Sequence, residues 1–87
     1  MVSQKTTLKN AQGFHMRPAS LFANTLGKYK CDITIKYNGD SINAKSLMNI
    51  IAVGIKCGSE IEIICDGSDE KEALKEAVSL IESGLGE

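Results

Sequence analysis

The chain has 87 residues, of which 43% are hydrophobic and 24% are charged, and its formal net charge is −1 at pH 7. These values are typical of a small globular domain, so we expect residues 1–87 to form one domain, and the balanced charge excludes nonspecific binding to nucleic acid. The N-terminus lacks the apolar core of a signal peptide and no apolar run is long enough to span a bilayer, so we expect a cytoplasmic protein without membrane insertion.

The first two elements are expected on either side of a loop over residues 10–14. Residues 2–8 alternate apolar or β-branched positions with polar ones, which predicts a strand with one buried face. A helix is expected from about residue 16 to Gly27, because its apolar residues recur at helical spacing and glycine commonly follows a helix end.

A hairpin is expected next. Residues 32–37 alternate again and predict a second strand. Asn38-Gly39 follows, and both residues accept positive φ in a tight turn. The chain then returns as a third strand over residues 40–44.

The remaining elements are a short helix, a strand and a longer helix. Ser46 is the expected N-cap of the short helix. Residues 60–66 predict a fourth strand, and Asp69 with Glu72 resembles a capping box before a helix that runs up to Gly84. The order βαββαβα favours an antiparallel or mixed sheet with all helices on one face.

The stretch from Gly13 to Ser20 reads Gly-Phe-His-Met-Arg-Pro-Ala-Ser and contains the only histidine and the only proline of the chain. Proline is tolerated in a first helical turn, so the helix begins close to His15. The N–H groups and the positive dipole end at a helix start favour an anion and disfavour the imidazolium form. Arg17 adds a planar charged fork suited to phosphate oxygens. These features indicate an imidazole that takes up a phosphoryl group and hands it on.

Simpler interpretations stay open on these residues alone. A lone histidine near a helix start is often a surface residue or a cap, and Ser46 can be a plain N-cap. The charges of the last helix are typical of a solvated face. Cys31, Cys57 and Cys65 are odd in number and form no Cys-x-x-Cys pair, so we expect free thiols, with Cys57 exposed, and neither a metal site nor a cofactor.

Two motifs, Gly-Phe-His-Met-Arg-Pro-Ala-Ser at residues 13–20 and Ala-Lys-Ser-Leu-Met at residues 44–48, resemble those of HPr. HPr is the histidine-containing phosphocarrier of the bacterial phosphoenolpyruvate:sugar phosphotransferase system, and the likeness to its low-GC Gram-positive type extends over essentially the whole chain. The resemblance implies an α+β open-faced β-sandwich, in which a four-stranded antiparallel sheet of order 1423 carries three helices on one face. It also implies a phosphoryl carrier and not an enzyme.

The resemblance further implies the course of the phosphoryl group. His15 accepts it on Nδ1 from phosphorylated enzyme I, which draws it from phosphoenolpyruvate, and passes it to sugar-specific IIA proteins. Arg17 steadies the phosphate, and Met16 and Pro18 support it at the helix start. We expect the carrier to act as a monomer.

Ser46 matches the serine that HPr kinase/phosphorylase modifies in carbon catabolite repression, which acts through a transcription regulator. A phosphate at an N-cap is favoured by the helix dipole and adds a charge of roughly −1.5 to −2. A regulatory module acting through phosphorylated Ser46, with His15 vestigial, is therefore a second hypothesis. Retention of His15 argues against the regulatory-only paralogues that lack the histidine. A small binding domain for metal or nucleic acid is a third hypothesis, disfavoured because paired cysteines and basic or aromatic stripes are missing.

A partner-docking patch is expected beside the two motifs. The resemblance assigns to it four apolar residues: Phe14, Leu47, Met48 and Ile51. The chain departs from the common pattern at Met16, usually a small residue, at Asn49, usually glycine, and at Ile51, usually methionine. We expect Met16 to slow transfer or to narrow partner choice, and Ile51 to alter the surface that faces the regulator. Neither departure removes a group that the chemistry needs.

Overall fold

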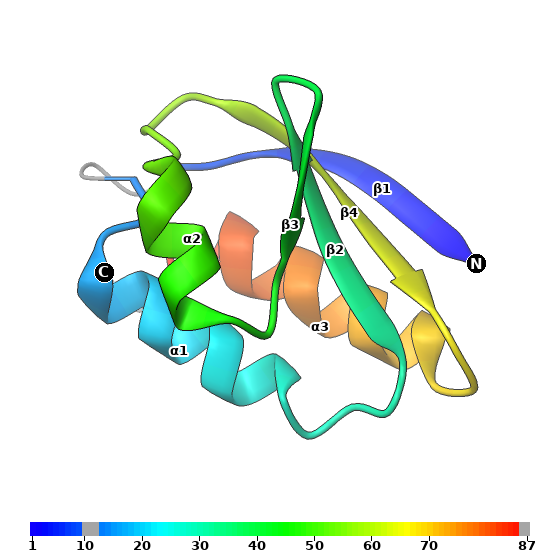
Figure 1. Ribbon diagram of the computed structural model, residues 1–87. Coiled ribbons are helices and arrows are strands. Elements are labelled where there is room, and N and C mark those ends of the chain that lie inside the picture. The colour runs from blue at the N-terminus through cyan, green and yellow to red at the C-terminus, as the bar shows by residue number, and fades with distance from the viewer. Residues whose placement is uncertain (10–12, 86–87) are drawn as a thin grey trace.

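The structure is a computed structural model that describes residues 1–9 and 13–85 (Figure 1). Its elements are β1 (Val2–Thr7), α1 (Met16–Leu26), β2 (Asp32–Tyr37), β3 (Asp40–Asn43), α2 (Leu47–Val53), β4 (Glu60–Asp66) and α3 (Glu70–Glu82). The predicted order βαββαβα is confirmed, and the predicted bounds of β2 and β4 are those of the structure. Of the loop expected over residues 10–14, residues 10–12 lie outside the described residues.

The four strands form one sheet of order β1-β4-β2-β3, in which every neighbouring pair is antiparallel. The three helices lie together on one face of this sheet (Figure 1). Alternation explains the two faces, because Ile33 and Ile35 of β2 are buried while Asp32 and Lys36 are exposed. The predicted open-faced α+β sandwich is therefore confirmed.

The hairpin between β2 and β3 turns at the predicted residues. Asn38 and Gly39 have φ of 50° and 84°, as a two-residue turn with positive φ requires. Ile42 of β3 pairs with Ile35 of β2 and is buried with it, so the hairpin is in the register that its hydrophobic pattern predicts.

The start of α3 differs from the predicted capping box. Asp69 is the N-cap residue, but its carboxylate makes no capping hydrogen bond. Instead it accepts hydrogen bonds from the backbone N–H groups of Lys30 at 2.8 Å and Cys31 at 2.9 Å. The hydrogen bond from Lys30 is the main reason why the pKa of Asp69 is lowered from its ordinary value. The capping-box prediction is wrong because a partner distant in sequence takes the carboxylate.

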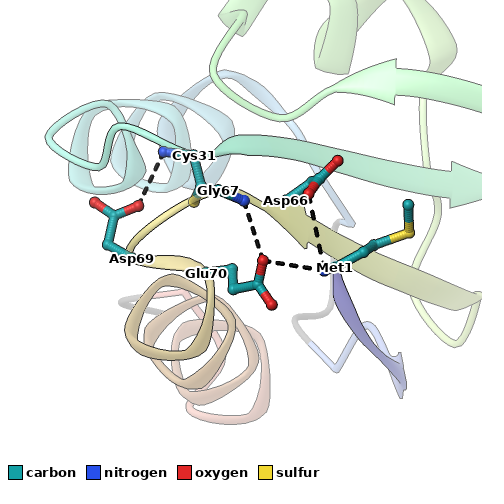
Figure 2. A network of polar contacts seen from close by, with 6 residues as sticks. All are labelled: Met1, Cys31, Asp66, Gly67, Asp69 and Glu70. Carbon is teal, nitrogen blue, oxygen red and sulfur yellow. Dashed lines mark hydrogen bonds and ion pairs between the residues drawn. The ribbon is translucent and has the colours of Figure 1, made fainter.

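Glu70 makes a second polar link at the same end of the molecule (Figure 2). Its carboxylate accepts a hydrogen bond from the backbone N–H of Gly67 at 3.1 Å and lies 3.1 Å from the terminal ammonium of Met1. The hydrogen bond from Gly67 leads the causes that lower the pKa of Glu70. The β4–α3 turn is thus tied to β1, on the side of the molecule away from the start of α1 (Figures 1 and 2).

Candidate functional site

His15 lies directly before α1 as its N-cap residue, with an extended backbone at φ −89° and ψ −173°. Its side chain is partly exposed and makes no capping hydrogen bond to the helix. The backbone N–H of Ala19 donates to the His15 carbonyl at 3.0 Å and closes the first turn. The prediction that α1 begins at His15 is confirmed, and the imidazole is not used to cap the helix.

The first turn of α1 presents backbone donors next to this imidazole. Met16 and Arg17 occupy the first two helical positions, whose N–H groups have no intrahelical acceptor. Pro18 occupies the third position, where its ring is buried and its missing N–H costs no hydrogen bond. The first turn contains no acidic side chain, so no carboxylate of the helix's own first turn offsets the positive end of the dipole. This arrangement favours an anion beside His15.

Two exposed side chains lie in this first turn, the cationic Arg17 and the large apolar Met16. Arg17 is exposed, and within residues 1–9 and 13–85 no carboxylate forms an ion pair with it. Its guanidinium therefore has no competing protein anion among these residues. Met16 is 57% exposed, so its side chain forms part of the surface directly after His15.

The segment of residues 55–59, after α2, forms backbone hydrogen bonds with Leu8 and Phe14, and the sequence patterns did not predict this contact. The backbone N–H of Phe14 donates to the carbonyl of Ile55 at 2.9 Å. Leu8, at the end of β1, donates to the carbonyl of Ser59 at 3.0 Å and accepts from the N–H of Gly58 at 2.8 Å. These bonds use backbone atoms alone, so no side-chain pattern signals them.

Phe14 departs from the predicted docking patch. Its side chain is only 3% exposed, and its ring meets the ring of Phe22 edge to face, with centroids 5.2 Å apart and planes at 62°. Burial of both rings is favoured because the core gains apolar area and an aromatic contact. Phe14 therefore offers almost no side-chain surface to a partner, and it anchors the site stretch to the core.

The other three predicted patch residues lie on α2, which packs beside α1 (Figure 1). Met48 is 70% exposed, whereas Leu47 and Ile51 are half-buried. On α1, Leu21 is 38% exposed, and the sequence did not place it in the patch. The most exposed large apolar side chains of α1 and α2 are therefore the methionines Met16 and Met48, a residue type that adapts readily to different surfaces.

Ser46 is the N-cap of α2, as predicted. Its Oγ accepts the backbone N–H of Asn49 at 3.4 Å, and its carbonyl accepts the N–H of Ile50 at 3.2 Å. The side chain is half-buried, and the preceding Lys45 donates its ammonium to the carbonyl of Tyr29. The long Oγ bond indicates a weak cap, so the hydroxyl can be modified at little cost to the helix.

The two buried cysteines are not available to this site as nucleophiles. Cys31 and Cys65 are buried. Cys57 is exposed and all three are free thiols, as predicted. Burial raises the pKa of Cys31 to about 11 and also raises that of Cys65, so both stay protonated at neutral pH. Across the described residues, no group of three or more histidine, cysteine, aspartate or glutamate side chains is placed to hold a metal ion.

A comparison with protein families decides what kind of protein this geometry belongs to. The family model described as "PTS HPr component phosphorylation site" matches residues 2–83. The chain belongs to the HPr family. It is therefore a phosphocarrier protein of the phosphotransferase system and not an enzyme, and its partners are those of that system. None of the helices in the described residues is long and apolar enough to cross a membrane.

Related proteins support this assignment over the full length of the chain. The crystal structure of HPr-C-His from Thermoanaerobacter tengcongensis is 39% identical, with a TM-score of 0.95 over 100% of this chain and 98% of that one. HPr from Bacillus anthracis is 35% identical, with a TM-score of 0.88 over 92% of this chain and 95% of that one. The HPr-like protein Crh of Bacillus subtilis is 32% identical over 82 residues, which cover 94% of this chain and 96% of Crh. A crystal structure of Crh is described as a swapped dimer.

Proposed function

We propose that His15 is the residue of this carrier that receives the phosphoryl group, from phosphorylated enzyme I, and that sugar-specific IIA proteins take it from there for sugar uptake. The observation that supports this role most is the position of the partly exposed imidazole, at the N-cap of α1 and directly before two backbone donors. An anion formed on the ring is stabilised there without any rearrangement of the helix.

The chemistry needs a neutral ring nitrogen and little else. The lone pair of Nδ1 attacks phosphorus, a bond from phosphorus to nitrogen forms, and the bond to the donor's leaving atom breaks, with its electron pair remaining on the donor. The proton on Nε2 stays on the ring. Catalysis of such a transfer depends on placing the two partners in line and on stabilising the charge of the three equatorial oxygens.

Arg17 supplies that stabilisation together with the helix start. Its guanidinium follows His15 by two positions, is exposed, and matches two phosphate oxygens at once. Met16 contributes its backbone N–H, and Pro18 sets the helical φ of the first turn. We therefore assign phosphate binding to Arg17 and the two N–H groups, and helix placement to Pro18.

A second function is favoured by Ser46. Its hydroxyl caps α2 weakly, at 3.4 Å from the nitrogen of Asn49, and it lies beside the exposed Met48. We propose that HPr kinase/phosphorylase modifies it, and that a catabolite-control transcription regulator docks on Leu47, Met48 and Ile51 afterwards. Crh, which is 32% identical over 82 residues, is described as the Bacillus subtilis catabolite repression HPr, and this supports a regulatory role.

We propose that the carrier is monomeric and acts in the cytoplasm. Three free cysteines are in keeping with a reducing compartment. Because a Crh crystal structure is described as a swapped dimer, the oligomeric state is checked by light scattering over a concentration series. A constant mass of one chain supports the monomer, and a rise to twice that mass contradicts it.

The assignment of His15 is tested with the purified protein, phosphoenolpyruvate and enzyme I. We expect one acid-labile phosphate per chain and none in His15→Ala. Since the chain has a single histidine, Asn24→Ala on the exposed face of α1 serves as a matched control and is expected to label fully. Labelling that persists in His15→Ala contradicts the proposal.

The role of Ser46 is tested separately with ATP and HPr kinase/phosphorylase. We expect an acid-stable phosphate in the wild type and in His15→Ala, and none in Ser46→Ala. Exposed Ser41 on β3 provides the control, because Ser41→Ala is expected to label like the wild type. Equal labelling of Ser46→Ala places the modification elsewhere.

A further inference from the structure

We propose that the backbone of residues 55–59, the segment after α2, positions the imidazole of His15, and that Gly13 is the residue that allows the two segments to meet. This inference rests on the proposed role of His15 as phosphoryl acceptor. Gly13 and residues 55–59 are positioning elements and not catalytic groups, because they act through the backbone of the site stretch.

The closest approach is at Gly13. Its φ is +70°, and a Cβ built there lies 2.4 Å from the carbonyl oxygen of Ile55, 2.9 Å from Cα of Lys56 and 3.1 Å from the nitrogen of Cys57. All three neighbours are backbone atoms, which cannot rotate away as a side chain does. Only glycine therefore permits this contact, both for its space and for its conformation.

Backbone hydrogen bonds of Phe14 and of His15 itself fix the position of the His15 backbone. The N–H of Phe14 donates to the carbonyl of Ile55 at 2.9 Å, and the carbonyl of His15 accepts from Ala19 at 3.0 Å. The side chains of Phe14 and Ile55 are 3% and 2% exposed, so both ends of the first bond are anchored in the core. The Cα of His15 is thus held between a fixed loop and a fixed helix.

The same segment is also bonded to Leu8, directly after β1. Leu8 exchanges two backbone hydrogen bonds with it, to the carbonyl of Ser59 at 3.0 Å and from the N–H of Gly58 at 2.8 Å. Lys56 and Cys57 are exposed, and the hydrogen bonds to Leu8 and Phe14 use backbone atoms only, so these side chains are not needed for the contact. Residues 55–59 therefore hold both Leu8 and Phe14 through backbone hydrogen bonds.

The consequence for transfer is geometric. The reacting nitrogen must meet phosphorus in line at about 3–3.5 Å, and a misplacement of about 1 Å can cost on the order of 100-fold in rate. A side chain at position 13 pushes the backbone away from Ile55 and moves the imidazole relative to Arg17 and the helix start. The rate of the transfer step falls, while docking surfaces on α1 and α2 stay in place.

Three glycine-to-alanine variants test this. Together they separate the effect of strain at positive φ from the effect of a clash close to His15. Gly13→Ala combines positive φ with a backbone clash beside the site. Gly39→Ala, in the β2–β3 turn, has φ +84° and nothing within 4 Å, so it carries the strain alone. Gly67→Ala has a comparable clash, 2.6 Å from Cα and Cβ of Cys31, at the end of the molecule away from His15. Each is compared with wild type for unfolding, for the NMR signals of the single imidazole, and for single-turnover transfer from saturating phosphorylated enzyme I.

We expect Gly13→Ala to slow the transfer step by about tenfold or more and to shift the imidazole signals, under conditions where it is folded. Gly39→Ala and Gly67→Ala are expected to stay within about twofold of wild type in rate, with unmoved imidazole signals, whatever stability they lose. A folded Gly13→Ala with wild-type rate and signals overturns the proposal, and so does an equal slowing in Gly67→Ala.

Two further measurements test the positioning of His15 separately from its proposed role as phosphoryl acceptor. If Gly13→Ala does not fold, amide hydrogen exchange of Phe14 in the wild type decides, because the bond to Ile55 predicts protection of at least about 100-fold and an unprotected amide refutes it. If the wild type accepts no phosphoryl group, the proposed function fails, and the imidazole signals of the three variants still test the positioning on their own.

Discussion

Replacing Phe14 with alanine tests whether the residue next to His15 belongs to the core or to the docking surface. Its side chain is 3% exposed and its ring lies 5.2 Å from that of Phe22. Truncating a buried phenylalanine costs about 3–5 kcal/mol. An 87-residue domain at about 0.05–0.15 kcal/mol per residue has a free energy of unfolding of about 4–13 kcal/mol. We therefore expect Phe14→Ala to lose about 4 kcal/mol, a large share of the total.

The assay is urea unfolding followed by circular dichroism. With a slope of about 2 kcal/mol per molar urea, a loss of about 4 kcal/mol lowers the midpoint by about 2 M. Met48→Ala is the matched control, because Met48 is 70% exposed and its truncation is expected to change stability by less than about 0.5 kcal/mol while weakening partner binding. An unchanged midpoint for Phe14→Ala, with normal stability and weaker binding to enzyme I, refutes its placement in the core.

Substitutions at three other residues have distinct expected effects. Arg17→Gln is expected to slow phosphoryl transfer by about tenfold or more without changing the melting temperature, and Arg17→Lys to restore only part of the rate because the planar fork is lost; equal rates for all three proteins contradict this. Ser46→Ala is expected to cost about 0.5 kcal/mol in thermal unfolding, at the low end for a cap because the bond to Asn49 is 3.4 Å long, and a loss above about 2 kcal/mol is incompatible with a weak cap. The pKa of Asp69 is lowered in the folded state from an ordinary value of 3.8, so its contribution to stability is present above that value and is lost as the pH falls through the folded-state pKa. Asp69→Asn is expected to be less stable at pH 7 and to lose stability less steeply below about pH 4 in urea titrations; parallel pH curves rule this out.

Elements whose signals are local could be predicted from the sequence. β2 and β4 show their alternation over the residues that form them, and Asn38-Gly39 indicates its own turn. The start of α1 at His15 follows from Pro18 and the apolar spacing after it. The sheet order came from the resemblance to HPr, because alternation within a strand does not specify which strand is its neighbour.

Contacts between segments distant in sequence were the ones that could not be predicted. Asp69 has the residue type and position of a helix cap, yet its carboxylate accepts from the backbone of Lys30 and Cys31, which lie 39 and 38 residues before it in the sequence. Phe14 lies in a polar loop pattern, and its burial depends on Phe22 and on the carbonyl of Ile55. Backbone acceptors such as that carbonyl leave no trace in residue type.

The site shows the same division. The residues with chemical side chains, His15 and Arg17, and the cap Ser46 were identified from local patterns, and the structure places them at the starts of α1 and α2. The segment that holds His15 in place was missed, because it contributes backbone atoms and two exposed side chains. Residue types therefore indicate the chemistry of this carrier, and the fold adds how its imidazole is held.

The most direct measurement of the central claim is the site of the phosphate after reaction with phosphoenolpyruvate and enzyme I. Phosphorus NMR of the intact protein, followed by peptide mapping at alkaline pH, locates the phosphorus-bearing atom. The account predicts a single phosphoramidate resonance that disappears in mild acid, and a modified peptide that contains His15. A phosphate that survives acid, or one that maps to a peptide without His15, contradicts it.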